Sequence, residues 1–291
     1  MNPFDLPGPA FLVFYMALGV VVTVTLFFRR RQAESGTPPK IDCSDPYLIA
    51  YLRGGKNEAL RVAAISLIDR GLLKVDETNL VVAHESVGDL VRRPIEKALL
   101  REFQTPDEAT SIFNSGDLAA SCVEHEQTLT GFNLLPDATT KAARWRSFFI
   151  ALALLWGVAL VKILVAISRG RSNIAYLLVL AIAFAFFAFR AMHPFRTARG
   201  NILLADLRTL FASLKTRAAS LRPGGATNEL ALLAAVFGIG AVSEIAFPYA
   251  KKLYPKASSG SSSSSSSCGS ACGSSCGGGD GGGCGGCGGG D

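Results

Sequence analysis

The chain has 291 residues, of which 49% are hydrophobic and only 18% are charged, below the roughly 25% charged content of typical globular domains. Its formal net charge of +6 gathers in basic runs beside long apolar blocks, a pattern that indicates membrane orientation before nucleic-acid binding. This composition excludes an ordinary soluble protein. It favours a protein that combines membrane-spanning segments with one or two small domains.

The first apolar block, residues 10–28, carries no charge and approaches the roughly 20 residues that a helical membrane span requires. Arg29, Arg30 and Arg31 follow it, whereas only Asp5 precedes it. A cleaved signal peptide has the opposite order, with its basic stretch first. The positive-inside tendency places residues 1–9 outside and the chain from residue 32 onward in the cytoplasm.

The next segment, residues 32–143, is long enough for one small core. Its patterns predict a linker at 32–40, helices at 47–53 and from an Asn57 N-cap to Gly71, and a β-hairpin of 72–75 with 80–83. Helix, helix and hairpin in this order resemble a small winged-helix α+β domain. Because acidic residues offset its basic ones, no nucleic acid is expected as a partner, and the domain is interpreted as a protein-interaction or packing module beneath the membrane.

The second half of this segment is predicted to be helical. A helix is expected at 94–103, a capping-box pair with proline in Thr105-Pro-Asp-Glu108 predicts the start of another, and one helical stripe joins Leu118, Cys122, His125, Leu129 and Phe132. Cys122 and His125 lie on one face with Glu126 nearby, which is a candidate metal site. A cysteine and a histidine on an amphipathic stripe are more often packing residues, and that is the interpretation preferred here.

Residues 148–167 and 174–189 are two further apolar blocks with a short polar connection, and they predict a transmembrane hairpin. Lys162 lies near the end of the first block, where its long side chain can reach the headgroups. In residues 201–254, leucines repeat at helical spacing and predict cytoplasmic or interfacial helices. The apolar stretch 230–242 is short for a span, and the lysines after it would then lie outside, so three spans are favoured over four.

Residues 258–291 form a serine-, then glycine- and cysteine-rich tail without large apolar side chains, and such a composition predicts disorder. Five of the seven cysteines lie in it, and they are the candidate metal ligands: Cys268, Cys272, Cys276, Cys284 and Cys287. Clustered thiolates suit zinc or copper(I). Only Cys284 and Cys287 have the two-residue gap common in zinc sites, so a passive tail is the alternative interpretation.

The partial enzyme motifs in the sequence each lack a residue that the motif requires. His84-Glu85 and His125-Glu126 lack the second histidine of a zinc protease, since Gly88 and Leu129 stand there. No other motif supplies a catalytic or cofactor-binding residue, and a non-enzymatic protein is predicted.

The chain resembles a family of uncharacterised bacterial membrane proteins called near-uncomplex, which carry low-complexity Gly/Cys tails. The resemblance rests on four motifs and on the tail: Asp45-Pro-Tyr47 with Ala50-Tyr-Leu-Arg-Gly-Gly55, Leu67-Ile-Asp-Arg-Gly-Leu-Leu73, Arg196-Thr-Ala-Arg-Gly200, and Ala235-Val-Phe-Gly238. It implies a membrane architecture and supplies no catalytic residues. The serine run departs from the mostly Gly/Cys tails of the family.

The sequence thus predicts a mainly α, multi-pass protein of a bacterial inner membrane, with three transmembrane helices, a winged-helix-like cytoplasmic domain and a disordered C-terminal tail. Its expected partners are the lipid bilayer and a protein, and its expected role is that of a non-enzymatic scaffold or protein-interaction protein. A membrane-tethered metal or thiol sensor using the tail is the first alternative, and a hydrolase with an unrecognised site is the second.

Overall fold

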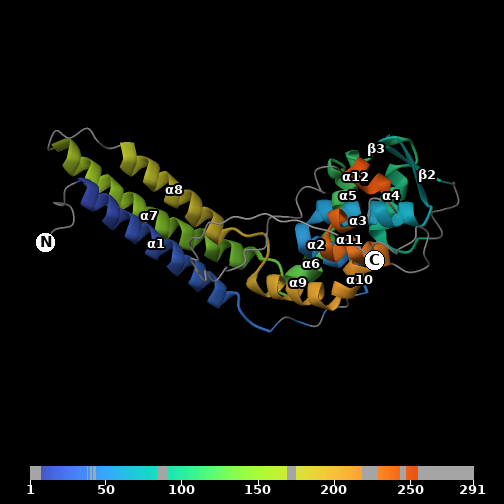
Figure 1. Cartoon of the computed structure of the whole chain (residues 1–291), viewed down its shortest axis with the longest axis horizontal. Coiled ribbons are helices and arrows are strands. Elements are labelled where there is room, and N and C mark those ends of the chain that lie inside the picture. The colour runs from blue at the N-terminus through green and yellow to red at the C-terminus, as the bar shows by residue number, and fades with distance from the viewer. Residues whose placement is uncertain are drawn as a thin grey trace, which may run out of the picture. The chain divides into compact units, whose positions relative to one another are not determined.

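The computed structural model describes residues 8–37, 39, 41, 44–83, 91–168, 175–217, 229–242 and 247–254. This part of the chain is mostly helical. It contains three helices long and apolar enough to cross a membrane: α1 (Gly8–Ala33), α7 (Ala138–Ser168) and α8 (Ala175–Met192). The predicted blocks 10–28 and 148–167 lie in α1 and α7, and the third block lies in α8 from residue 175 onward, its first residue being outside the described chain. The three helices pack together (Figure 1).

Small residues and one buried hydroxyl hold these three helices together. Gly19 of α1 faces the ring of Phe184 on α8 so closely that a Cβ would clash with it, while Ala181 of α8 is buried beside that ring. Tyr15, also on α1, donates a 3.1 Å hydrogen bond from its hydroxyl to the carbonyl oxygen of Leu155 on α7. Close backbone approach and interhelical hydrogen bonds are the forces that associate helices in lipid.

The helix α7 is longer than a membrane crossing needs. Its 31 residues correspond to roughly 46 Å at 1.5 Å per residue, against roughly 30 Å for a bilayer core. The surplus is its polar beginning, which carries Lys141, Arg144 and Arg146 before the apolar block. At the other end, the ammonium of Lys162 lies 4.5 Å from the ring centroid of Phe11, so this side chain contacts an aromatic face of α1.

The predicted helix–helix–hairpin order is present in the next segment. It consists of α2 (Pro46–Gly54), α3 (Lys56–Asp69) and the antiparallel strands β1 (Leu73–Asp76) and β2 (Asn79–Val82). The helix α3 begins one residue before the predicted Asn57 cap, with Gly55 at its N-cap. It stops because Gly71 adopts a φ of +71°, and the amides of Gly71 and Leu72 bond back to the carbonyls of Ile68 and Leu67 at 2.9 Å each. That pair of bonds is a Schellman motif.

The following segment differs from the sequence prediction. After α4 (Pro94–Glu102), the predicted helix start at Thr105 is wrong, because Asp107 and Glu108 form a short strand, β3, that pairs with β2. The predicted single stripe is two helices, α5 (Gly116–Ser121) and α6 (Val123–Gly131), which meet at Cys122. Leu118 and Leu129 are buried as expected, but Phe132 is 40% exposed.

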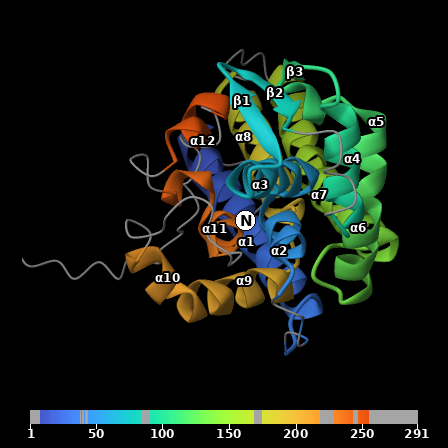
Figure 2. The ribbon, with the colours of Figure 1, turned by 90° about the vertical axis from the view of Figure 1, so that its right-hand side faces the viewer.

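The end of the described chain completes the core of this domain. It contains α9 (Ala198–Leu210), α10 (Ala212–Thr216), α11 (Glu229–Phe237) and α12 (Pro248–Leu253), with a 3-10 turn at Ile239–Ala241. Another 3-10 turn, Ser111–Phe113, lies earlier in the chain, between β3 and α5. The apolar stretch from residue 230 is α11, which is buried against α2 and α3 (Figure 2). One hydrophobic cluster runs from Tyr47 to Tyr254.

That shared core distinguishes the domain from the small module predicted within residues 32–143. Leu233, Ala234 and Val236 of α11 are fully buried in the same cluster as α3, so the C-terminal helices are part of the domain. A winged-helix domain is not shown by this arrangement, since the helix–helix–hairpin unit does not form a core of its own. Residues 258–291, including all five tail cysteines, lie outside the described residues.

Candidate functional site

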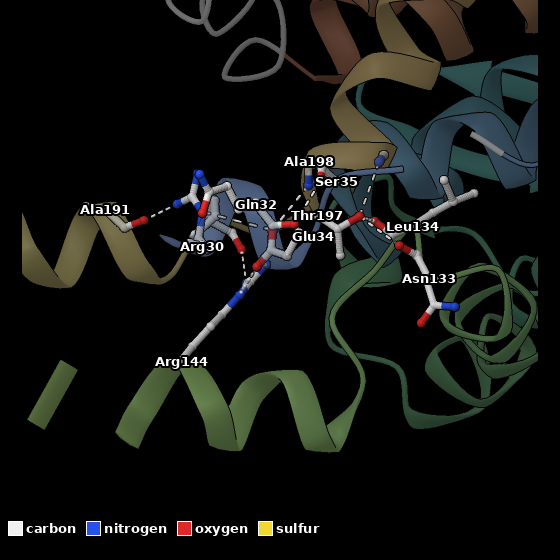
Figure 3. Close-up of polar contacts among 12 residues, drawn as sticks. Arg30, Gln32, Glu34, Ser35, Asn133, Leu134, Arg144, Ala191, Thr197 and Ala198 are labelled. Carbon is white, nitrogen blue, oxygen red and sulfur yellow. Dashed lines mark hydrogen bonds and ion pairs between the residues drawn. The ribbon is translucent and has the colours of Figure 1, made fainter. Parts of the chain in front are cut away.

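The ends of the three apolar helices meet the helical domain at a cluster of polar contacts, which we call the junction. At its centre is Glu34, which follows α1 and is 8% exposed. Arg144 of α7 donates a 2.7 Å hydrogen bond from Nε to Glu34 Oε1, and its Nη2 lies 2.6 Å from the same oxygen. The other oxygen, Oε2, accepts a 3.2 Å bond from the amide of Ala198 at the start of α9 (Figure 3).

Two arginines of the junction, Arg144 and Arg30, also bind carbonyl oxygens at the end of α8 and just after it. Arg144 donates from Nη1 to the carbonyl of Pro194 at 2.9 Å, and Arg30 donates to the carbonyl of Ala191 while its Nε lies 4.0 Å from Glu34. These carbonyls belong to the end of α8 and the segment after it, where helix carbonyls lack helical partners. The carboxylate of Glu34 and the guanidinium groups of Arg30 and Arg144 therefore join α1, α7, α8 and α9 (Figure 3).

Thr197 holds the domain side of the junction. Its Oγ1 caps α9 by accepting a 3.2 Å hydrogen bond from the amide of Gly200. The same hydroxyl donates to the carbonyl oxygens of Asn133 and Leu134, which lie 2.8 and 3.0 Å away. Gly200 is required here because a Cβ would lie 2.5 Å from the Leu134 oxygen. The Arg196-Thr-Ala-Arg-Gly200 motif is thus the point where α9 docks on the loop after α6.

A second polar cluster lies inside the domain around Asp45. This carboxylate caps α2 by accepting the amide of Tyr47 at 3.0 Å. It also lies 2.5 Å from Nη1 of Arg93 and 3.4 Å from Nε2 of His125. Burial raises the pKa of the Asp45 carboxyl, but the hydrogen bond from His125 and the charge of Arg93 outweigh burial and hold that pKa below its ordinary value.

The neighbouring carboxylate, Glu96, makes a parallel set of contacts. The hydroxyl of Tyr47 donates to Glu96 at 2.5 Å, and Nη1 of Arg70 lies 3.2 Å from the same oxygen. Burial, followed by the charge of Glu96, raises the pKa of Tyr47. The two carboxylates therefore link α2, α3, α4 and α6, which is a structural function for every charged group involved.

Cys122 and His125, the candidate metal pair of the sequence, have different surroundings. His125 contacts Asp45, whereas Cys122 is 2% exposed, and burial raises the pKa of its thiol. A buried, protonated thiol is an inert packing group rather than a nucleophile. Among the residues that the structure describes, no group of three or more His, Cys, Asp or Glu side chains could hold a metal ion.

Sequence reasoning missed the junction. Arg30 and Arg144 were interpreted as topology signals and Glu34 as part of a linker. The available signal was the position of Glu34, an acid four residues after Arg30 at the end of a basic run, a spacing that brings two side chains together on a helix.

The fold and the junction define a class: a mostly helical chain with three candidate membrane-spanning helices whose ends are bound to a helical domain. No protein-family model, curated protein or solved structure matches the chain. Comparison with known proteins therefore does not narrow this class.

Proposed function

We propose that this chain is a non-enzymatic scaffold or protein-interaction protein of a bacterial inner membrane, in which three membrane helices present the helical domain at the cytoplasmic surface. The observation that carries the proposal is the buried Glu34–Arg144 pair, which binds the start of α9 as well as the membrane helices. Desolvating two charges is costly, and replacing such a pair by apolar side chains is often neutral or stabilising. We therefore assign the pair a role in fixing geometry, as a scaffold requires.

The basic flanks support a cytoplasmic domain. Arg29, Arg30 and Arg31 end α1, Arg144 and Arg146 lie near the start of α7, and Arg190 lies near the end of α8. All three helices thus carry arginine at the end that leads to the domain. The rings of Trp145, Phe189 and His193 cluster at the same level, with both rings centred 4.6 Å from the imidazole. Aromatic belts of this kind form at membrane–water interfaces.

The proposed use of the Pro46–Val82 unit is as a winged-helix-like module for protein contacts. Its arginines support a structural rather than a DNA-binding use: Arg53 and Arg61 both pair with Glu58, and Arg70 pairs with Glu96. Guanidinium groups engaged by carboxylates are not available to neutralise phosphates. No nucleic acid is therefore included among the proposed partners.

Cross-linking in native membranes tests the scaffold proposal. The full chain, carrying an affinity tag, is cross-linked and purified beside an Arg144→Met variant and an Arg146→Met control. We expect a protein partner at fixed stoichiometry with the wild type and the control, and loss of most of that partner with Arg144→Met. Absence of any stoichiometric partner, together with covalent labelling of the chain by activity-based hydrolase probes, would contradict the proposal.

A metal or thiol sensor is the second proposal, and the five tail cysteines support it. Zinc or copper(I) would bind their thiolates and order the tail. Metal titration of the full chain, compared with a chain ending at Lys256, separates the proposals. Tail-dependent binding supports the sensor, whereas equal weak binding by both chains contradicts it.

A further inference from the structure

A groove lies between α1 and α7 at the arginine-bearing end of the membrane helices. It exists because α8 packs extensively against both helices while α1 and α7 contact each other much less. The groove has a volume of about 830 Å³ and reaches from Val21 and Leu154 to Ala33 and Thr139. It therefore runs along the helices from their apolar part to their polar ends.

The two ends of the groove differ in chemistry. The apolar end is lined by Val21, Val22, Leu26, Ile150 and Leu154, and the polar end by Arg29, Arg30, Arg144, Arg146, Thr139 and Thr140. Along α1, eight residues separate Val21 from Arg29, which is roughly 12 Å at the helical rise. An occupant must therefore be apolar over that length and anionic at one end.

The charge of the polar end is not neutralised by the protein. Four arginines line the groove against one acid, Glu34, which leaves a formal charge of +3. The carboxylate of Glu34 already forms ion pairs with Arg30 and Arg144. Arg29 and Arg146 are exposed, and neither has an acidic partner within 4.0 Å in the described part of the chain. Asp137, which directly precedes α7, accepts hydrogen bonds from the hydroxyl of Thr139 and the amide of Thr140. It does not line the groove.

We propose that this groove binds one anionic phospholipid, with its phosphate at Arg29 and Arg146 and an acyl chain along Val21 and Leu154. In a bilayer the apolar end faces hydrocarbon, so an acyl chain fills it without stranding polar groups. Guanidinium groups form paired hydrogen bonds with phosphate oxygens. The inference needs the three helices to span a membrane and does not depend on the scaffold role.

Native mass spectrometry of the full chain released from mixed phosphatidylglycerol–phosphatidylcholine nanodiscs tests the site. The double variant Arg29→Gln/Arg146→Gln removes the two exposed arginines of the groove. Arg31→Gln/Arg190→Gln is the matched control, since these arginines are also exposed at the ends of α1 and α8 but do not line the groove. Each arginine near anionic lipid contributes about fivefold, so we expect about thirtyfold weaker phosphatidylglycerol retention for the groove variant.

A second pair of variants tests the apolar end without changing charge. Thr25→Trp fills the groove, whereas Val24→Trp adds the same ring on an exposed position of α1 outside it. We expect Thr25→Trp alone to abolish lipid retention, and we expect soluble glycerol phosphate not to displace the lipid. Equal losses in groove and control variants, retention of phosphatidylcholine as strongly as phosphatidylglycerol, or displacement by glycerol phosphate would overturn the proposal. The cross-linking experiment is repeated with Thr25→Trp. If this variant still captures the protein partner, loss of lipid binding is distinguished from failure of the scaffold proposal.

Discussion

Removing one member of the buried Glu34–Arg144 pair should destabilise the protein far more than removing both. The two side chains are 6% and 5% exposed, so solvent screens neither charge. Arg144→Met removes the closer guanidinium from Glu34 and leaves only Arg30, whose Nε lies 4.0 Å from the carboxylate. Breaking such a buried pair costs about 3–5 kcal/mol. In the double variant Glu34→Leu/Arg144→Met both charges of this pair are removed, and Arg30 keeps its hydrogen bond to the Ala191 carbonyl, so a loss of only about 1–2 kcal/mol is expected.

Pulse proteolysis in urea measures these free energies of unfolding for the full chain in detergent micelles. The matched control is Arg146→Met, the same substitution two residues along α7 at an exposed position, for which a change within about 0.5 kcal/mol is expected. The reasoning fails if Arg144→Met costs less than about 1 kcal/mol, as an exposed ion pair would. It also fails if the double variant is less stable than Arg144→Met alone.

Four further predictions address other parts of the molecule. Thr197→Val should cost about 1–2 kcal/mol in the same assay, because it removes the α9 cap and two carbonyl contacts. Gly19→Leu should lower resistance to unfolding by sodium dodecyl sulfate by about 1–3 kcal/mol, since its new side chain meets Phe184, whereas Gly157→Leu faces open space and serves as control. Asp45→Asn should destabilise the domain at neutral pH. This difference should begin to shrink as pH falls below the unfolded pKa of about 3.9 and should disappear only below the lower pKa of the folded carboxyl. Alkylation in intact cells should label all five tail cysteines, because the tail sequence has no large apolar side chains that could bury them.

Each of these predictions has an outcome that contradicts it. Thr197→Val at wild-type stability would remove the docking role of the α9 cap. Equal effects at Gly19 and Gly157 would argue against the close contact with α8. A pH-independent difference for Asp45→Asn would show that the carboxylate charge is irrelevant. Zinc-dependent protection of four tail cysteines would favour the sensor over the scaffold.

The three candidate membrane-spanning helices could be predicted closely because their sequence signal is local. Blocks 10–28 and 148–167 and residues 175–189 of the third block fall within observed helices, since apolar length alone identifies a candidate span. The hairpin and the stop at Gly71 could also be predicted, because turn and cap preferences act over a few residues. These are the parts of the fold that a neighbouring stretch of sequence determines.

Contacts between distant segments could not be predicted in this way. Nothing in residues 230–242 indicates that α11 packs on α2 and α3, nearly 180 residues earlier in the chain. The helix predicted to start at Thr105 does not form, because Asp107 and Glu108 pair with β2 instead. Local sequence preferences contain no information about such a distant pairing partner. The junction is of the same kind, because Glu34 and Arg144 are 110 residues apart.

The membrane topology is the most direct test of this account, since the scaffold proposal places the arginine-bearing ends of the helices in the cytoplasm and the lipid groove needs all three helices to span the membrane. Alkaline phosphatase and green fluorescent protein are fused in turn after Lys40, Ser172 and Ser258. Three spans with a cytoplasmic domain predict fluorescence at Lys40 and Ser258 and phosphatase activity at Ser172. Fluorescence at Ser172 or phosphatase activity at Ser258 would contradict the account.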